Sequence, residues 1–192
     1  MELLTILNHC HRHRGFVYEH ARFGPDKTRI DVDVAQPSAG SLVLSYVVHG
    51  DIGELCVMPL AAPARGDELW RHTCFEAFVG TAAGAAYYEF NFAPSAQWAA
   101  YRFSGYRDGM RVATEMSAPR IEVRATPERY SLQASLELSA LSGLRREAGW
   151  RLGLAAVTED RRGGMSYWAL AHPPGKADFH HRDCFAHELS TA

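Results

Sequence analysis

The segment from Tyr130 to Leu138 alternates strictly between apolar and polar residues, and this pattern constrains the fold more than any other stretch. Successive side chains of a strand point to opposite faces, so the segment is predicted to be a strand with one buried and one wet face. Such strands are typical of antiparallel sheets, which must bury the apolar face against a second layer. The apolar positions are Tyr130, Leu132, Ala134, Leu136 and Leu138.

Further strand-like segments, separated by turn signals such as Pro37–Gly40 and Arg161–Gly164, recur along the chain. They are predicted at 3–11, 16–18, 29–34, 41–49, 73–79, 87–92, 99–104, 106–112, 121–125, 150–159, 166–171 and 184–189. A helical turn is expected only within 138–147. Roughly a dozen short strands without a linker predict an all-β antiparallel sandwich or barrel that forms a single domain over residues 1–192.

Composition and charge exclude several classes of function. The net charge of −2 argues against a nucleic-acid-binding protein, which usually carries a basic excess. No stretch approaches 18 apolar residues, so we expect no membrane span. The first residues lack a basic region followed by a long apolar run, which predicts a cytoplasmic protein. The four cysteines follow no metal-binding spacing and are predicted to be free thiols.

Aromatic and acidic residues concentrate between Leu69 and Tyr101, a stretch that reads as two adjacent strands joined by a Gly/Ala loop. A second cluster, SYWALAHPPGKADFHHRDCF, lies at 166–185. Alternation in the two strands assigns one set of residues to packing and leaves three polar residues on the opposite faces. The packing set is Phe75, Phe90 and Phe92, and the polar set is Glu76, Glu89 and Asn91.

The segments LWRHTCFEAFVG and YYEFNFAPSAQWAAYRFSGYRDGM, together with the second cluster, resemble DOMON-like bacterial proteins grouped with the family 9 carbohydrate-binding module. This resemblance covers nearly the whole chain. It implies a jelly-roll-like β-sandwich with a ligand site on one side or end, and relatives bind either sugars or haem. In the sugar-binding module two tryptophans sandwich a terminal sugar. Trp70 resembles one of them, and Trp168 lies where the second would fall.

These observations predict a pocket built from the two clusters. Flat aromatic rings stack on the C–H faces of a sugar, while guanidinium and carboxylate groups bind its hydroxyls. The candidate ligand-binding residues are Trp70, Arg71, His72, Glu76, Asn91, Arg102, Trp168, His172, His180 and His181. Two alternatives stand beside this set. The tryptophans could belong to the core, and Glu76 and Glu89 could form internal ion pairs with Arg71 or Arg102.

The predicted function is non-catalytic binding of a carbohydrate-like small molecule by tryptophan stacking and polar contacts, without a cofactor and without a defined protein partner. A first alternative is a haem-binding electron carrier. Its axial ligands would be one of Met58, Met110, Met116 and Met165 with His72 or His172, although no CxxCH attachment motif occurs. A second alternative is a structural or interaction domain without a small ligand.

Two further chemistries receive weaker support from the sequence. The acids on neighbouring strands would suit a glycosidase only at a fixed carboxyl separation, which a sequence does not contain. Metal binding could use the C-terminal group His172, Asp178, His180, His181 and Asp183, but its spacing matches no zinc signature. The alternating His9, His11 and His13 form a second weak metal candidate.

Overall fold

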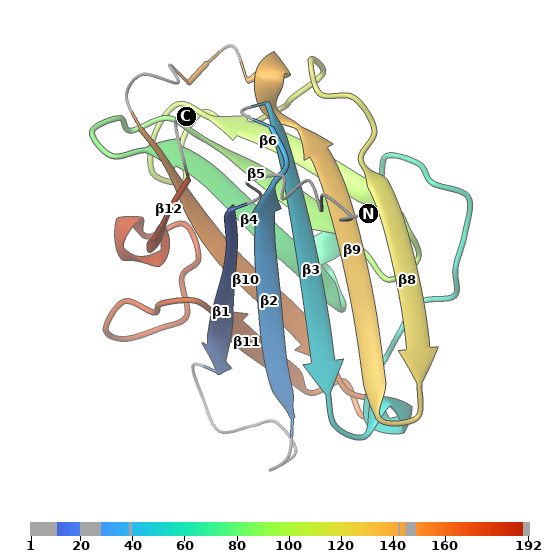
Figure 1. The fold of residues 1–192 in the computed structure, drawn as a ribbon. Coiled ribbons are helices and arrows are strands. Elements are labelled where there is room, and N and C mark those ends of the chain that lie inside the picture. Colours follow the sequence, from blue (N-terminus) through green and yellow to red (C-terminus); the bar gives the residue numbers. More distant parts are fainter. Residues whose placement is uncertain (1–10, 20–27, 39, 142, 145–148, 190–192) are drawn as a thin grey trace, which may run out of the picture.

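The chain folds into two antiparallel β-sheets packed face to face, as the computed structural model shows (Figure 1). The structure describes residues 11–19, 28–38, 40–141, 143–144 and 149–189. The strand expected from residue 3 and the first member of the alternating histidine series, His9, lie outside this part of the chain. The prediction of an all-β antiparallel sandwich is confirmed, whereas the jelly-roll connectivity and the single-domain assignment stay predictions.

The first sheet, sheet A, has the strand order β1-β2-β3-β9-β8. Its members are β1 (His11–Glu19), β2 (Arg29–Gln36), β3 (Ser41–His49), β9 (Arg129–Glu137) and β8 (Arg120–Thr126). The alternating segment recognised in the sequence is β9, and its apolar residues are buried while its polar ones are half-buried or exposed. Sheet A therefore has one buried face and one solvent-facing side, as the alternation predicts.

The second sheet, sheet B, has the strand order β7-β6-β5-β4-β10-β11. Its members are β7 (Arg111–Val112), β6 (Trp98–Phe103), β5 (Tyr87–Phe92), β4 (Cys74–Thr81), β10 (Trp150–Glu159) and β11 (Met165–Ala169), with β12 (His187–Glu188) paired to β10. Strand β1 pairs with β2 and, at its end, with β11, so it joins the two sheets along one edge.

A large apolar cluster fills the space between the sheets. Tyr46 of β3, Phe75 of β4 and Tyr130 of β9 lie in it, with the Phe75 ring 5.1 Å from Tyr46 and 6.1 Å from Tyr130. The Tyr46 hydroxyl donates a 2.7 Å hydrogen bond across the sandwich to the backbone carbonyl of Glu76. This bond satisfies the one polar atom that the tyrosine brings into the core.

Sheet B is also buried on its outer face, so β4 and β5 are covered on both sides. A second apolar cluster covers that face, and the C-terminal segment that follows β11 contributes to it. Its main aromatic members are Phe78, Tyr87, Tyr101, Phe103, Phe179 and Phe185. Acids at outward positions of β4 and β5 are therefore placed under a cover of protein and not in water.

Several strand boundaries agree with the sequence prediction, and those at 41–49, 87–92 and 150–159 coincide with β3, β5 and β10. The predicted strand at 106–112 is wrong over most of its length, because Gly105 and Asp108 close a turn and only 111–112 is extended. The strand at 184–189 is also shorter than predicted. A 3-10 turn spans Arg182–Cys184, and β12 contains two residues.

The remaining local predictions have mixed outcomes. The expected helical turn is a 3-10 turn at Leu138–Ala140. Trp70 lies in a 3-10 turn, Leu69–Arg71, and not at the start of a strand. Within the described residues the cysteines are free thiols, and Cys74 and Cys184 are buried.

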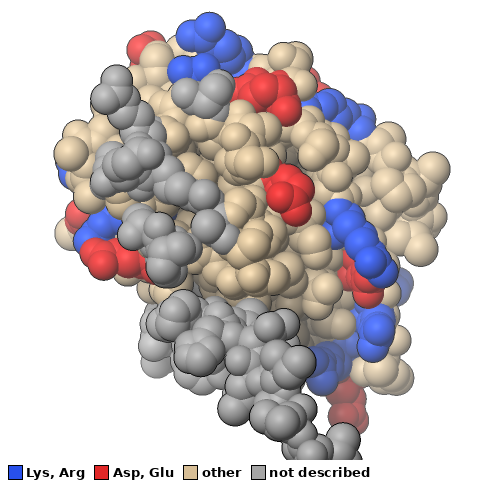
Figure 2. All heavy atoms as spheres, turned by 45° about the horizontal axis from the view of Figure 1, so that its top comes forward, with Lys and Arg blue, Asp and Glu red and all other residues tan. Residues whose placement is uncertain are grey.

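Charged side chains of both signs lie scattered over the face of the molecule drawn in Figure 2. Figure 2 shows basic and acidic side chains interspersed among uncharged residues on the face in view, without a continuous patch of either sign. This distribution agrees with the net charge of −2. Among the described residues, no helix has both the length and the apolar character needed to cross a bilayer.

Candidate functional site

The outer face of sheet B contains a cavity of about 790 Å³, which we call the sheet B cavity. Its aromatic wall is formed by Trp70, Phe103, Tyr167 and Phe179, and its polar lining by Arg71, Glu76, Glu89, Arg107 and His180. Tyr167 and Met110 line it while remaining 42% and 54% exposed, so the cavity is open to solvent. Its volume lies in the range of small-molecule sites.

Two buried carboxyl groups, Glu76 of β4 and Glu89 of β5, form the floor of the cavity. Their exposed fractions are 3% and 4%. Glu76 lies opposite Asn91 in the strand register, and the Asn91 amide donates a 2.7 Å hydrogen bond to Glu89. Among the described residues, none forms a hydrogen bond or ion pair with the Glu76 carboxyl group. The floor therefore offers one partnered and one free carboxyl group to a ligand.

Burial changes the acidity of both groups. It raises the pKa of Glu76 well above its usual value, and the negative charge of Glu89 raises it further, while Arg107 acts in the opposite direction. Burial also raises the pKa of Glu89 to about 7, against the opposing effects of the Asn91 hydrogen bond and the Arg107 charge. Two like charges in a poorly solvated site resist simultaneous ionisation, so the pair readily retains a proton near neutral pH.

An ion pair between Arg107 and Asp178 fixes the rim of the cavity. Arg107 follows strand β6 in the turn at residues 105–108, and its guanidinium donates to Asp178 Oδ1 over 2.8 and 3.2 Å. The Tyr106 hydroxyl and the backbone N–H of His180 also donate to Asp178. Burial alone would raise the pKa of Asp178, but the hydrogen bonds from Tyr106 and Arg107 lower it below its usual value.

His180 connects this rim to the floor. Its Nδ1 is 2.8 Å from the Tyr87 hydroxyl, which itself accepts the backbone N–H of Arg107, and its Nε2 is 3.8 Å from Glu89. The Tyr87 hydroxyl is thus placed to donate to Nδ1, which assigns the proton of the neutral imidazole to Nε2, facing Glu89. Burial lowers the pKa of His180 to about 4, so the ring is neutral at physiological pH.

Trp70 is held at the cavity by the residues around its 3-10 turn. Its ring meets Tyr101 edge-on with centroids 5.6 Å apart, and the Tyr101 hydroxyl donates to Asp67. Glu68, at the start of the turn, has a left-handed backbone with φ of 51° and binds Arg71 over 2.8 Å. The indole is half-buried, which leaves part of its surface to face a ligand.

The structure brings together half of the residues predicted from the sequence. Trp70, Arg71, Glu76 and His180 line the sheet B cavity, and Asn91 lies directly beneath it through its bond to Glu89. The remaining five are placed elsewhere. They are His72, Arg102, Trp168, His172 and His181.

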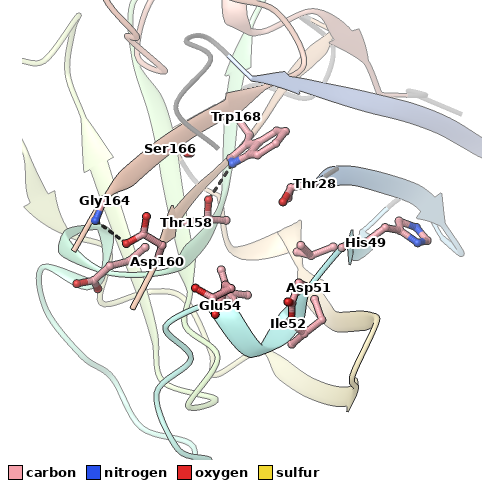
Figure 3. A pocket seen from close by; sticks show the side chains of 14 residues that line it. Thr28, His49, Asp51, Ile52, Glu54, Thr158, Asp160, Gly164, Ser166 and Trp168 are labelled. Atoms are coloured by element: carbon pink, nitrogen blue, oxygen red, sulfur yellow. Dashed lines mark hydrogen bonds between the residues drawn. The ribbon is translucent and has the colours of Figure 1, made fainter. Parts of the chain in front are cut away.

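Trp168 lies on the opposite face of sheet B from Trp70, so the two tryptophans do not enclose one ligand. It is 4% exposed, belongs to the core between the sheets and donates a 2.9 Å hydrogen bond to Thr158 (Figure 3). The cavity that it lines there has a volume of about 40 Å³. That space suits a few water molecules and is too small for a sugar. The expectation of a tryptophan pair at one site is corrected accordingly.

The other four residues also lie apart from the cavity lining. Arg102 faces the inner side of β6, with its guanidinium 5.9 Å from the Tyr88 ring, and exposed His72 pairs with Glu159 over 2.8 Å. His181 lines a neighbouring cavity of about 370 Å³. The ring centroids of His172 and Phe179 are 6.3 Å apart, and His172 is not among the residues that line the sheet B cavity.

The ion pairs expected for Glu76 and Glu89 with Arg71 or Arg102 are not formed. Arg71 pairs with Glu68, and Arg102 lies on the inner face of sheet B, away from the acids. Burial raises the pKa of Glu76 and Glu89, and the positive charge that acts to lower it is that of Arg107. Sequence reasoning missed Arg107 because it read 106–112 as a strand. The signal was present in Gly105–Gly109, where two glycines flank Tyr-Arg-Asp, a composition typical of a turn.

Tyr167 is the second residue that the sequence analysis missed. It lies opposite Val157 of β10, and both face the cavity, while Trp168 lies opposite the core residue Ala156. Both residues are aromatic, so their side-chain type does not tell which of them faces the cavity. The register of β11 against β10 places Tyr167 on the cavity side and Trp168 on the core side.

The alternative chemistries find limited support in the geometry. No group of three or more His, Cys, Asp or Glu side chains within the described residues is arranged to hold a metal ion. Of the methionines considered for haem, Met110 and Met165 line the sheet B cavity, but His72 and His172 are not among its lining residues.

Comparison with known proteins relates the fold to solved structures. No family model matches the chain, and a search of curated proteins found no significant match. A protein from Bacteroides uniformis ATCC 8492, proposed to bind carbohydrate, is similar in structure, with a TM-score of 0.63 and 14% identity. The similarity covers 90% of this chain and 83% of that one.

A family 9 carbohydrate-binding module from Caldicellulosiruptor kristjanssonii, solved with cellotriose, is also similar. Its TM-score is 0.51 at 11% identity, over 85% of this chain and 74% of the module. At this level of identity the likeness establishes a shared fold. It agrees with the part of the sequence resemblance that concerns the carbohydrate-binding module, whereas the DOMON-like grouping stays a prediction.

Proposed function

We propose that the protein binds a carbohydrate-like ligand in the sheet B cavity, without covalent chemistry. One observation carries the proposal. The cavity combines an accessible aromatic wall with buried carboxyl groups on its floor, and sugars require both kinds of surface. The fold shared with a carbohydrate-binding module supports the same function.

The lining residues suggest distinct roles. The rings of Trp70 and Tyr167 would stack on the C–H faces of the sugar, and Glu76 and Glu89 would bind its hydroxyl groups. A carboxylate accepts hydrogen bonds from hydroxyl groups, whereas a protonated carboxyl group can also donate one. Arg107 is already held by Asp178, so its free donors are presented to the ligand without a further loss of side-chain freedom.

Calorimetric titration with a panel of mono- and disaccharides tests the proposal. We expect Trp70→Ala to weaken the binding of the best saccharide at least about tenfold, because a stacking surface is lost. The variant should keep its fold, since the indole is only half-buried. Leu60→Ala is the matched control: it also shortens an apolar side chain, but Leu60 is 67% exposed and does not line the cavity.

The proposal would be wrong if no saccharide of the panel bound the protein. It would also be wrong if Trp70→Ala and Leu60→Ala had the same effect on affinity. A melting curve of each variant separates loss of a contact from loss of the fold.

A further inference from the structure

The floor of the sheet B cavity contains two acidic groups and no cation that is paired with them. Glu76 and Glu89 are both almost completely buried, and Arg107, the cation whose charge acts on both, is engaged by Asp178. His180, which points its Nε2 at Glu89, is neutral. The cavity therefore contains acids without a matching positive charge of their own.

The Glu76 carboxyl group is the decisive element of this arrangement. It is 3% exposed, lines the cavity and forms no hydrogen bond or ion pair with any of the described residues. A buried carboxyl group usually has a partner, because the transfer of an unpaired charge or polar group out of water is costly. The missing partner can come from a bound ligand.

We infer that the preferred ligand of the sheet B cavity is an amino sugar whose protonated amine binds between Glu76 and Glu89. This inference rests on the proposed function and names the class of carbohydrate. An ammonium group has three donors and no acceptor, so it matches a floor made of two carboxyl groups. Charge-assisted hydrogen bonds of this kind are about twice as strong as neutral ones.

The aromatic wall favours the same ligand. Trp70, Phe103, Tyr167 and Phe179 line the space above the acids. Aromatic faces attract cations as well as C–H groups, and indole does so most strongly. A neutral sugar would use the rings and neutral hydrogen bonds to the floor, whereas an amino sugar would add charge-assisted hydrogen bonds to the two acids.

A divalent cation is a poorer match for the same two acids. Such ions take six or more oxygen ligands from protein and water, and no group of three or more metal-ligating side chains is present among the described residues. The basic side chains that line the cavity beside the acids are Arg71, Arg107 and the neutral His180, and Arg107 is paired with Asp178. Arg71 is similarly neutralised by Glu68.

Three β-1,4-linked disaccharides of equal backbone test the inference by calorimetry: cellobiose, its 2,2′-diamino analogue and the di-N-acetylated form of that analogue. The diamine should bind at least about tenfold more tightly than either neutral disaccharide, a difference of about 1.4 kcal/mol. Glu76→Gln should abolish this preference, because glutamine has the same shape but cannot give up a proton to form a carboxylate beside the ammonium group. Glu122→Gln in sheet A removes the same charge far from the cavity and should preserve the preference.

Each contrary result has a distinct meaning. Equal affinity for cellobiose and the diamine would overturn the inference and leave the proposed function standing. A preference for the diamine that persisted in Glu76→Gln would also overturn the inference, because the ammonium group would then be bound by residues other than Glu76. Failure of all three disaccharides to bind, with other saccharides binding, would overturn the inference alone, and failure of every saccharide would overturn both. If Glu76→Gln did not fold, Glu89→Gln would replace it under the same criteria.

Discussion

Glu76 and Glu89 are costly residues for the stability of this sandwich. A single buried carboxyl group resists ionisation, and a second one beside it increases the penalty. Arg107 and Asn91 reduce the penalty in part, since both act to lower the pKa of Glu89. A sheet face that needed only to be packed would carry apolar residues at these positions, as β4 does at Phe78. The cost of the pair therefore supports the proposal that these two acids bind a ligand.

This interpretation predicts a specific dependence of stability on pH. The pKa of Glu89 rises from 4.5 to about 7 on folding, so the folded protein binds more protons than the unfolded chain between these values. The stabilising effect of the proton is complete below about pH 4.5 and is lost as pH rises through about 7. His180 acts oppositely: its pKa falls from 6.5 to about 4, so its stabilising effect is present above 6.5 and lost as pH falls through 4.

The Glu89→Gln variant separates the two effects. We expect it to raise the free energy of unfolding at about pH 8 by up to about 3 kcal/mol, at about 1.4 kcal/mol per unit of pKa, with little change at about pH 4. Chemical denaturation at the two pH values measures this difference. Glu137→Gln, an exposed acid in β9, is the control and should show no such dependence. An equal effect of Glu89→Gln at both pH values would contradict the burial of an ionisable group at this position.

At the scale of elements, alternation made most strands predictable, because a strand with one wet face shows its pattern directly in the sequence. The pattern fails where both faces are covered. In β11 either Tyr167 or Trp168 could face the cavity, and only the pairing with β10 assigns Tyr167 to it. The turn at residues 105–108 was obscured for a related reason, since Tyr106 and Met110 look like the apolar residues of a strand but are 57% and 54% exposed.

The junction between that turn and the C-terminal segment depends on one carboxylate. Asp178 accepts hydrogen bonds from Tyr106 and Arg107 of the turn. Asp178→Asn should destabilise the protein by about 1 kcal/mol, because the hydrogen bonds to a charged acceptor weaken at a partly exposed site. It should also speed amide hydrogen exchange between residues 172 and 181. Asp183→Asn, which alters an exposed acid of the same segment, should leave exchange at 172–181 unchanged.

Similar exchange in the two variants would mean that the Asp178 contacts do not hold the segment. The comparison therefore tests whether the rim is fixed before a ligand binds.

At the scale of the whole molecule, the protein consists of two packed sheets (Figure 1). A second apolar cluster covers the outer face of sheet B. Sheet A is an antiparallel sheet with one solvent-facing side, and local sequence predicted its strands β2, β3, β8 and β9. Strand β1 was predicted only in part, because the expected strands at 3–11 and 16–18 leave out residues 12–15 of His11–Glu19. The candidate site forms where the turn before β4, the turn after β6 and the C-terminal segment meet on sheet B. Contacts between segments as distant as Arg107 and Asp178 determine it, and no local pattern contains that information.

The four tryptophans offer the most direct test of where a ligand binds. Trp98, Trp150 and Trp168 belong to the core between the sheets, and Trp70 alone lines the sheet B cavity. Each indole gives a separate N–H signal in a two-dimensional ¹⁵N–¹H NMR spectrum. Titration with the tightest-binding saccharide should shift the Trp70 signal and leave the other three nearly unchanged. A saturable shift of Trp168 without one of Trp70, or no shift of any indole signal, would contradict binding in the sheet B cavity.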